Sequence, residues 1–210
     1  MRNRFTVFSL VLLFLAAVFA AGSAFAQGPP PGPPPGPPSG YKPNQSLEPE
    51  QPEGNGANAG GKWMVFQTED PMTAAKLVRY ELESDNTMPD SDRHSKIILS
   101  CKNGKLEHAD FEPSIRMSGP NRPGFWGQPQ MEVLVRVDGS HSNHGWNWLG
   151  RALSMDKGTT RELIGSHLFR VEFLGMRRQA PPAPQIAEFS PDGLDLGKVR
   201  HDCDISPKKP

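Results

Sequence analysis

The chain has 210 residues, and its 23 basic residues are balanced by 23 acidic ones. A chain without clustered basic residues lacks the positive surface with which proteins bind nucleic acids. It also lacks the polybasic run that holds peripheral proteins on anionic membranes. The composition therefore excludes a nucleic-acid partner.

The segment 1–26 has the three parts of a secretory signal peptide. Arg2 and Arg4 precede a long apolar stretch, and Ala24 and Ala26 supply the small residues of a cleavage site. We therefore predict export to the periplasm or the outside of the cell. After cleavage we expect no stable membrane insertion, because no second apolar stretch of that length follows.

A Pro/Gly-rich tether is predicted over residues 27–61. Residues 28–40 read GPPPGPPPGPPSG, and this density of proline favours an extended polyproline II spacer. Residues 41–61 contain few apolar side chains to bury, so we expect disorder there. A ligand for a proline-binding partner is the alternative interpretation.

Residues 62–205 are predicted to form one mainly-β domain, followed by a tail at 206–210. Apolar and polar residues alternate along most of this stretch, as is typical of half-buried strands. Asn103-Gly104 predicts a tight hairpin turn, and the prolines of 181–184 predict a loop. The pattern favours an antiparallel β-sandwich or a partly closed barrel. Strands are expected at residues 78–83, 97–101, 106–111, 131–138 and 169–173.

Helical signals are restricted to two short segments. Residues 159–164 predict a short turn of helix. Ser190-Pro191-Asp192 resembles a helix start, with an N-cap, a proline in the first position and an acid in the first turn. We therefore expect one or two short helices.

Cys101 and Cys203 are the only cysteines of the chain. In an exported protein, such a pair predicts one disulfide, and two free buried thiols are the alternative. The bridge would tie the middle of the domain to its C-terminal end. Closing so long a loop stabilises the fold by at most about 4–5 kcal/mol in the chain-entropy model.

Four aromatic residues are candidates for a binding surface. Phe125 and Trp126 lie within residues 118–130, a Pro/Gly-rich stretch that indicates a long loop. Trp146 and Trp148 would share one face of an extended segment. An exposed patch of these four rings would suit a protein, peptide or glycan partner, whereas core packing is the alternative.

The histidines offer a second kind of site. His141 and His144 would both ligate a metal if their segment curled, and His201 lies near the second cysteine. Imidazole is a common zinc and copper ligand. A metal site needs three or four converging ligands, and the sequence supplies no clear further ligand, so no metal is predicted.

The motifs of common enzyme classes are absent from the sequence. There is no Gly-x-Ser-x-Gly elbow, no His-Glu-x-x-His and no phosphate-binding loop. Asp70, Asp138 and Glu172 are carboxylates that a catalytic pair would use, but sequence spacing does not establish how far apart they lie, and each occupies a position typical of an ordinary turn or strand surface. We therefore predict no catalytic residue, no cofactor and no enzymatic activity.

The order of short motifs resembles the VasI-type periplasmic proteins associated with type VI secretion. The sequence departs from that family at Ser100, where an arginine is usual, and at Asp204 and Ile205, where an aromatic is usual. The resemblance implies an accessory or binding role and carries over no catalytic residue. It rests on Trp63, Asp70-Pro71-Met72-Thr73, residues 98–104, residues 135–138, Trp146, residues 154–157, residues 188–194 and Cys203.

Together these features predict an exported, non-enzymatic accessory or binding domain clamped by one disulfide. We expect a protein partner in the periplasm or envelope. One alternative is a secreted metal-binding protein or metalloenzyme that uses His141 and His144. The other is a glycan or cell-wall binder that uses the aromatic loops.

Overall fold

The computed structural model describes residues 56–89 and 91–208 of the chain. The predicted signal peptide and the predicted tether up to residue 55 lie outside these residues. Among the helices of the described part, none is long and apolar enough to span a bilayer.

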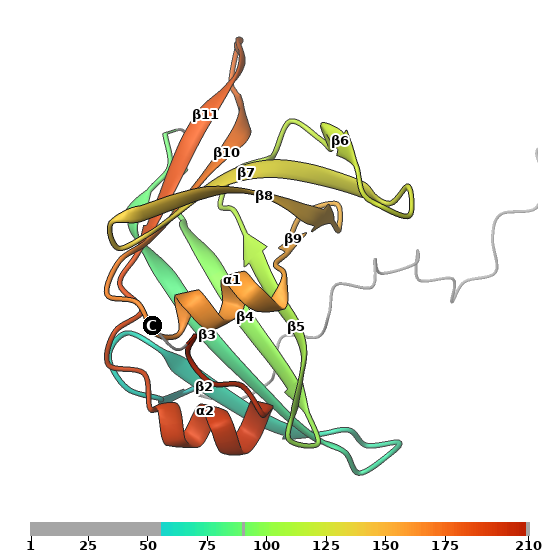
Figure 1. Cartoon of the computed structure of the whole chain (residues 1–210), viewed down its shortest axis with the longest axis vertical. Helices are drawn as coiled ribbons and strands as arrows, with labels where there is room; N and C mark the ends of the chain where they lie inside the picture. The colour runs from blue at the N-terminus through green and yellow to red at the C-terminus, as the bar shows by residue number, and fades with distance from the viewer. Residues whose placement is uncertain (1–55, 90, 209–210) are drawn as a thin grey trace, which may run out of the picture. The chain divides into compact units, whose positions relative to one another are not determined.

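The described strands form one antiparallel sheet that curls around a single core (Figure 1). The strands pair in the order β1-β2-β3-β4-β5-β9-β8-β7-β10-β11, and β6 pairs with β7 beside this path. The strands are β1 (Ala57–Asn58), β2 (Met64–Glu69), β3 (Lys76–Thr87), β4 (His94–Lys102), β5 (Lys105–Glu112), β6 (Arg122–Pro123), β7 (Pro129–Val137), β8 (Ser140–Trp148), β9 (Leu153–Ser154), β10 (Phe169–Arg177) and β11 (Ala180–Phe189). The helices are α1 (Lys157–Leu163) and α2 (Leu196–Cys203).

The predicted fold class is confirmed: the domain is mainly β and antiparallel, with two short helices and one disulfide. Every predicted strand coincides with an observed one, although the strand predicted at 131–138 ends one residue earlier, at Val137 of β7. The Asn103-Gly104 turn joins β4 to β5, and both residues have the positive φ angles (49° and 77°) that such a hairpin turn requires. The sheet does not close, so the molecule is a partly closed barrel.

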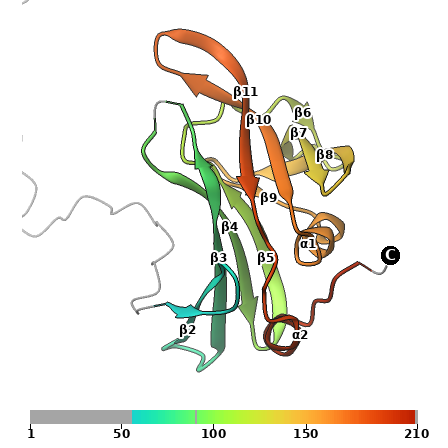
Figure 2. The same cartoon turned by 90° about the vertical axis from the view of Figure 1, so that its left-hand side faces the viewer.

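The core lies between the two walls of the curled sheet, β3–β5 on one side and β7, β10 and β11 on the other (Figure 2). Phe111 of β5 is at its centre. Its ring centroid lies 5.3 Å from that of Phe173, 6.1 Å from Trp146 and 6.2 Å from Phe189. Strands distant in the sequence therefore meet in one aromatic cluster.

A seam between β3 and β11 leaves the barrel open. β2 pairs only with the first half of β3, residues 76–81, and β11 lies beside the second half. Asn86 bridges this gap with its side chain. Its amide nitrogen donates to the Ile186 carbonyl at 2.8 Å, and its amide oxygen accepts from the Glu188 amide at 2.9 Å. The side chain thus substitutes for one step of a β-ladder.

The prediction of a loop at residues 181–184 is wrong, because these residues belong to β11. A proline cannot donate to a neighbouring strand, and it is therefore tolerated only at a sheet edge. β11 is such an edge strand. Its three prolines also remove donors with which a foreign strand would pair, which protects the edge.

The helix α2 begins later than predicted. Its N-cap is Asp195, whose side chain accepts a hydrogen bond from the Lys198 amide, and not Ser190. Gly193 has a φ angle of 83°, which a right-handed helix does not allow. The turn that starts at Ser190 therefore cannot continue into α2. The other helix, α1, agrees with its prediction and is capped by Asp156.

The predicted disulfide between Cys101 and Cys203 is present, with Cα atoms 5.2 Å apart. It joins β4 to the last residue of α2. A buried ionic cluster lies beside it. The Asp202 carboxylate accepts hydrogen bonds from the Tyr80 hydroxyl at 2.9 Å and the Lys76 ammonium at 3.0 Å. Covalent and ionic links therefore hold α2 on the sheet together.

Both ends of the described chain pack on the domain. The Trp63 indole donates to the Pro191 carbonyl at 2.9 Å, and the Asp195 amide donates to the Ala59 carbonyl at 2.9 Å. Residues 57–61, which we assigned to the tether, therefore belong to the domain.

The described part of the predicted tail is also held in place. The Lys208 amide donates to the Arg161 carbonyl at 3.1 Å, and its ammonium contacts Glu162 at 2.6 Å. The C-terminal segment therefore crosses α1.

The seam bridge gives a first prediction. Replacing Asn86 with alanine leaves one carbonyl and one amide of β11 without their partner, so we expect the free energy of unfolding to fall by about 1–2 kcal/mol. Urea denaturation measures this change. Asn143→Ala, at an exposed position of β8, is the matched control and should stay near the wild-type value. An equal loss in both variants would refute the role of the bridge.

The Asp202 cluster gives a second prediction. Burial raises the pKa of this carboxyl, but hydrogen bonds from His201, Lys76 and Tyr80 outweigh burial and lower the pKa to about 2. A carboxyl with a lowered folded-state pKa stabilises the fold above its unfolded pKa, near 4. We therefore expect Asp202 to contribute about 2 kcal/mol at neutral pH, lost as the pH falls from about 4 to about 2.

Urea denaturation of Asp202→Asn across this pH range tests the second prediction. The variant should be destabilised at neutral pH and should approach the wild type at the acidic end. Asp204→Asn is the control, because Asp204 is exposed and lies at the helix C-cap, where asparagine is tolerated. A wild-type pH profile in Asp202→Asn would contradict the assignment.

Candidate functional site

The loop between β6 and β7 forms a hydrogen-bonded tip that projects from the sheet (Figure 1). Pro123 pairs with Pro129 at its base. The Gly124 amide donates to the Gln128 carbonyl at 2.7 Å, and the Gly127 amide donates to the Gly124 carbonyl at 2.9 Å. We call residues 124–128 the aromatic tip. Because its backbone is bonded internally, the conformation of the tip is defined without any partner.

The aromatic tip presents two large apolar side chains to solvent. Phe125 is 88% exposed and Trp126 is 86% exposed. Their ring centroids are 4.8 Å apart and their planes are perpendicular, at 89°. The Trp126 amide is bonded to the Gln128 side chain at 2.9 Å, which fixes the backbone beneath the indole. Such side chains are usually buried in a monomeric protein, so this exposed pair is the candidate contact surface of the domain.

A third exposed apolar residue lies at the same end of the β7–β8 hairpin. The register pairs Gln130 of β7 with Asn147 of β8, so the loop that follows β8 lies beside the base of the tip. Leu149 in this loop is 56% exposed. The sequence analysis does not identify Leu149, because a single leucine after two tryptophans has no distinguishing pattern.

The predicted patch of four aromatics is wrong in part. Trp146 is completely buried and packs against Phe111. Trp148 is half-buried and packs against the same core. The two rings do share one face of β8, as expected, but this face is the inner one. Only Phe125 and Trp126 are left as an exposed pair.

The structure does not bring the predicted metal ligands together. β8 runs without a register shift from Ser140 to Trp148, so His141 and His144, three residues apart, lie on opposite faces. His144 contacts Asp156 at 3.2 Å and Thr159 at 3.1 Å, at the start of α1. His201 is on α2. Within residues 56–89 and 91–208, no group of three or more acidic, histidine or cysteine side chains is arranged to hold a metal.

Hydrogen bonds to Asp156 perturb its acidity. Burial raises the pKa of this carboxyl, but hydrogen bonds from Thr159 and the proximity of His144 outweigh burial, so the pKa is lowered. The carboxylate is therefore charged at neutral pH and caps α1. His144 completes this cap on the inner face of β8 and has a structural role.

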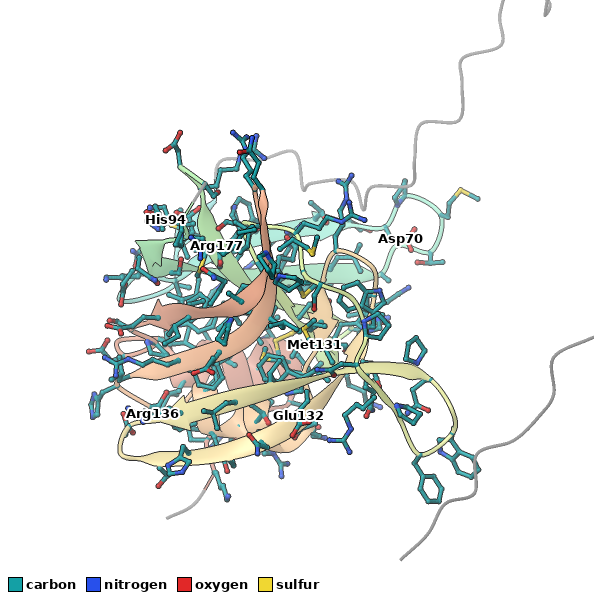
Figure 3. All side chains as sticks on the ribbon, turned by 90° about the horizontal axis from the view of Figure 1, so that it is seen from above. Asp70, His94, Met131, Glu132, Arg136 and Arg177 are labelled. Atoms are coloured by element: carbon teal, nitrogen blue, oxygen red, sulfur yellow. A yellow bond between two sulfur atoms is a disulfide. The ribbon has the colours of Figure 1, made fainter. Side chains whose placement is uncertain are left out.

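The three carboxylates considered for catalysis are also apart. Asp70 closes the turn after β2 by accepting from the Met72 and Thr73 amides. Asp138 lies in the β7–β8 turn and accepts from the amides of residues 167 and 168. In Figure 3, Asp70 and Arg136, which is two residues before Asp138, are on opposite sides of the molecule. Glu172 is on β10, so no pair forms.

The charge distribution near the aromatic tip was not foreseen. Residues 113–131 contain Arg116 and Arg122 but no acidic residue, and residues 139–155 contain Arg151 but no acidic residue. The fold places the two loops of these stretches at the same end of the β7–β8 hairpin. Because acidic and basic residues are balanced over the whole chain, the net charge does not show this local excess of arginines. The sequence signal for it is the absence of acidic residues from both stretches.

Arg122 lies at the base of the aromatic tip. An added Cβ at Gly145 would lie 3.2 Å from its guanidinium carbon, so the missing side chain of this glycine leaves space for the arginine on the outer face of β8. The nearest acid along β7 is Glu132, opposite Gly145.

Comparison of the chain with models of protein families, with curated proteins and with solved structures found no match. The resemblance to the VasI-type proteins therefore remains a prediction.

Proposed function

We propose that this protein is an exported, non-enzymatic binding domain that contacts a component of the cell envelope through its aromatic tip. The observation that carries the proposal is the defined, projecting loop in which Phe125 and Trp126 are 88% and 86% exposed. An exposed aromatic pair of this kind supplies large apolar contact area at little entropic cost. The rest of the domain then serves as a rigid base for this contact.

Two features support a periplasmic or secreted location. The first is the predicted signal peptide at 1–26. The second is the disulfide between Cys101 and Cys203, since such bonds persist mainly in oxidising compartments. The predicted tether would give the domain reach from the point at which the chain is held.

The resemblance to VasI-type proteins supports a narrower proposal, that the domain is an accessory of type VI secretion with a protein partner in the periplasm. The genes beside its coding sequence test this. Secretion-system genes in that position would support it, and their absence would count against it.

A binding experiment tests the aromatic tip. Replacing Phe125 and Trp126 together with serine should weaken binding of the mature protein to isolated cell envelopes at least about tenfold, because hot-spot aromatics dominate such contacts. Co-sedimentation over a range of envelope concentrations gives the affinity. The fold should be unaffected, since neither ring contacts the core.

The matched control is Met72→Ser. Met72 is 90% exposed but lies in the loop between β2 and β3, away from the tip. Its replacement should leave envelope binding unchanged. The proposal is wrong if the double serine variant, with unaltered unfolding, binds envelopes as tightly as the wild type.

A further inference from the structure

The shape of the aromatic tip restricts what it can bind. The two rings are perpendicular, so they offer no flat shared face on which a sugar ring would stack. They also protrude, and no pocket surrounds them, since both are almost fully exposed. The occupant must therefore surround the rings, as either the interfacial layer of a lipid bilayer or a deep pocket of a protein does.

The charges around the tip favour the bilayer. Residues 123–129 are uncharged, and Leu149 adds an apolar side chain from the adjacent loop. A cationic side chain lies behind this apolar end: Arg122 is exposed at the base of the tip. An apolar tip with a cation behind it complements a membrane surface, which has an apolar interior and anionic headgroups.

We propose that the aromatic tip inserts Phe125 and Trp126 into the interfacial layer of a bilayer that contains anionic lipids, while Arg122 contacts the headgroups. This inference rests on the proposed function and names the envelope component. Tryptophan prefers the interfacial region of membranes because its ring is apolar and its N–H is polar. No membrane-spanning segment is needed, and the contact is reversible, because only two or three side chains are buried.

The cation lies beside the aromatic rings and is not part of a polybasic segment. Pairing of Pro123 with Pro129 holds Arg122 next to the aromatic tip. One cation near an anionic surface contributes about fivefold to binding. The contact should therefore be strongest on anionic vesicles at low salt and should weaken as salt screens Arg122.

Vesicle binding of the mature protein tests the inference. The probes are phosphatidylcholine vesicles with and without phosphatidylglycerol. We expect sedimentation with the anionic vesicles and a blue shift of tryptophan emission. Trp126 reports this shift, because Trp63 and Trp146 are completely buried and Trp148 is half-buried.

Three variants separate the contributions of the aromatic rings and of Arg122 to vesicle binding from that of an unrelated exposed side chain. Phe125→Ser with Trp126→Ser should lower the partition coefficient at least about tenfold, and Arg122→Gln should lower it about fivefold on anionic vesicles only. Met72→Ser should bind like the wild type. The inference is wrong if the wild-type protein binds neither kind of vesicle. It is also wrong if the double serine variant binds anionic vesicles as tightly as the wild type does.

The two proposals fail in different ways. One possible outcome is that the double serine variant loses binding to whole envelopes, although the wild type does not bind pure lipid vesicles. The tip then binds a protein or glycan of the envelope. The lipid inference is then wrong and the proposed function stands. If envelope binding is unchanged in the double serine variant, the proposed function itself is wrong.

Discussion

The open seam between β3 and β11 is the constraint on which the rest of this domain depends. A sheet that curls around a core without a continuous hydrogen-bond ladder must be held closed by other means. On β11, the Asn86 side chain takes the place of the missing strand partner. At the far end of the walls, α2 covers the core and is fixed by a disulfide and by the buried Asp202 (Figure 2). The aromatic tip can project because the base beneath it is rigid.

The strands could be predicted because burial leaves a period of two in the sequence. β7 and β10 show this plainly, with buried residues at every second position. β8 and β11 were missed for two physical reasons. Most residues of β8 are exposed and polar, so burial imposes little alternation on this strand. In β11 the prolines suggest a loop, yet an edge strand tolerates them because its outer amides have no partner.

Alternation in the sequence predicts less about the candidate site than about the strands. Alternation correctly places Trp146 and Trp148 on one face, but it cannot tell whether that face points inward, because the answer depends on strands distant in the sequence. The same limit applies to the histidines. His141 and His144 are close in the sequence, yet an extended strand separates residues three apart onto opposite faces. Loop residues such as Trp126 follow no period, so only their exposure in the fold distinguishes them from core aromatics.

The distribution of charge in space is a property that the fold determines and the net charge does not show. A chain with equal numbers of acids and bases has no preference for an anionic surface if its charges are evenly mixed in space. Here two acid-free stretches come from separate parts of the sequence, and the β7–β8 pairing brings their loops together beside the aromatic tip. The backbone of the tip is already ordered by its own hydrogen bonds, so little conformational entropy is lost on contact. A small contact area can then suffice for reversible attachment.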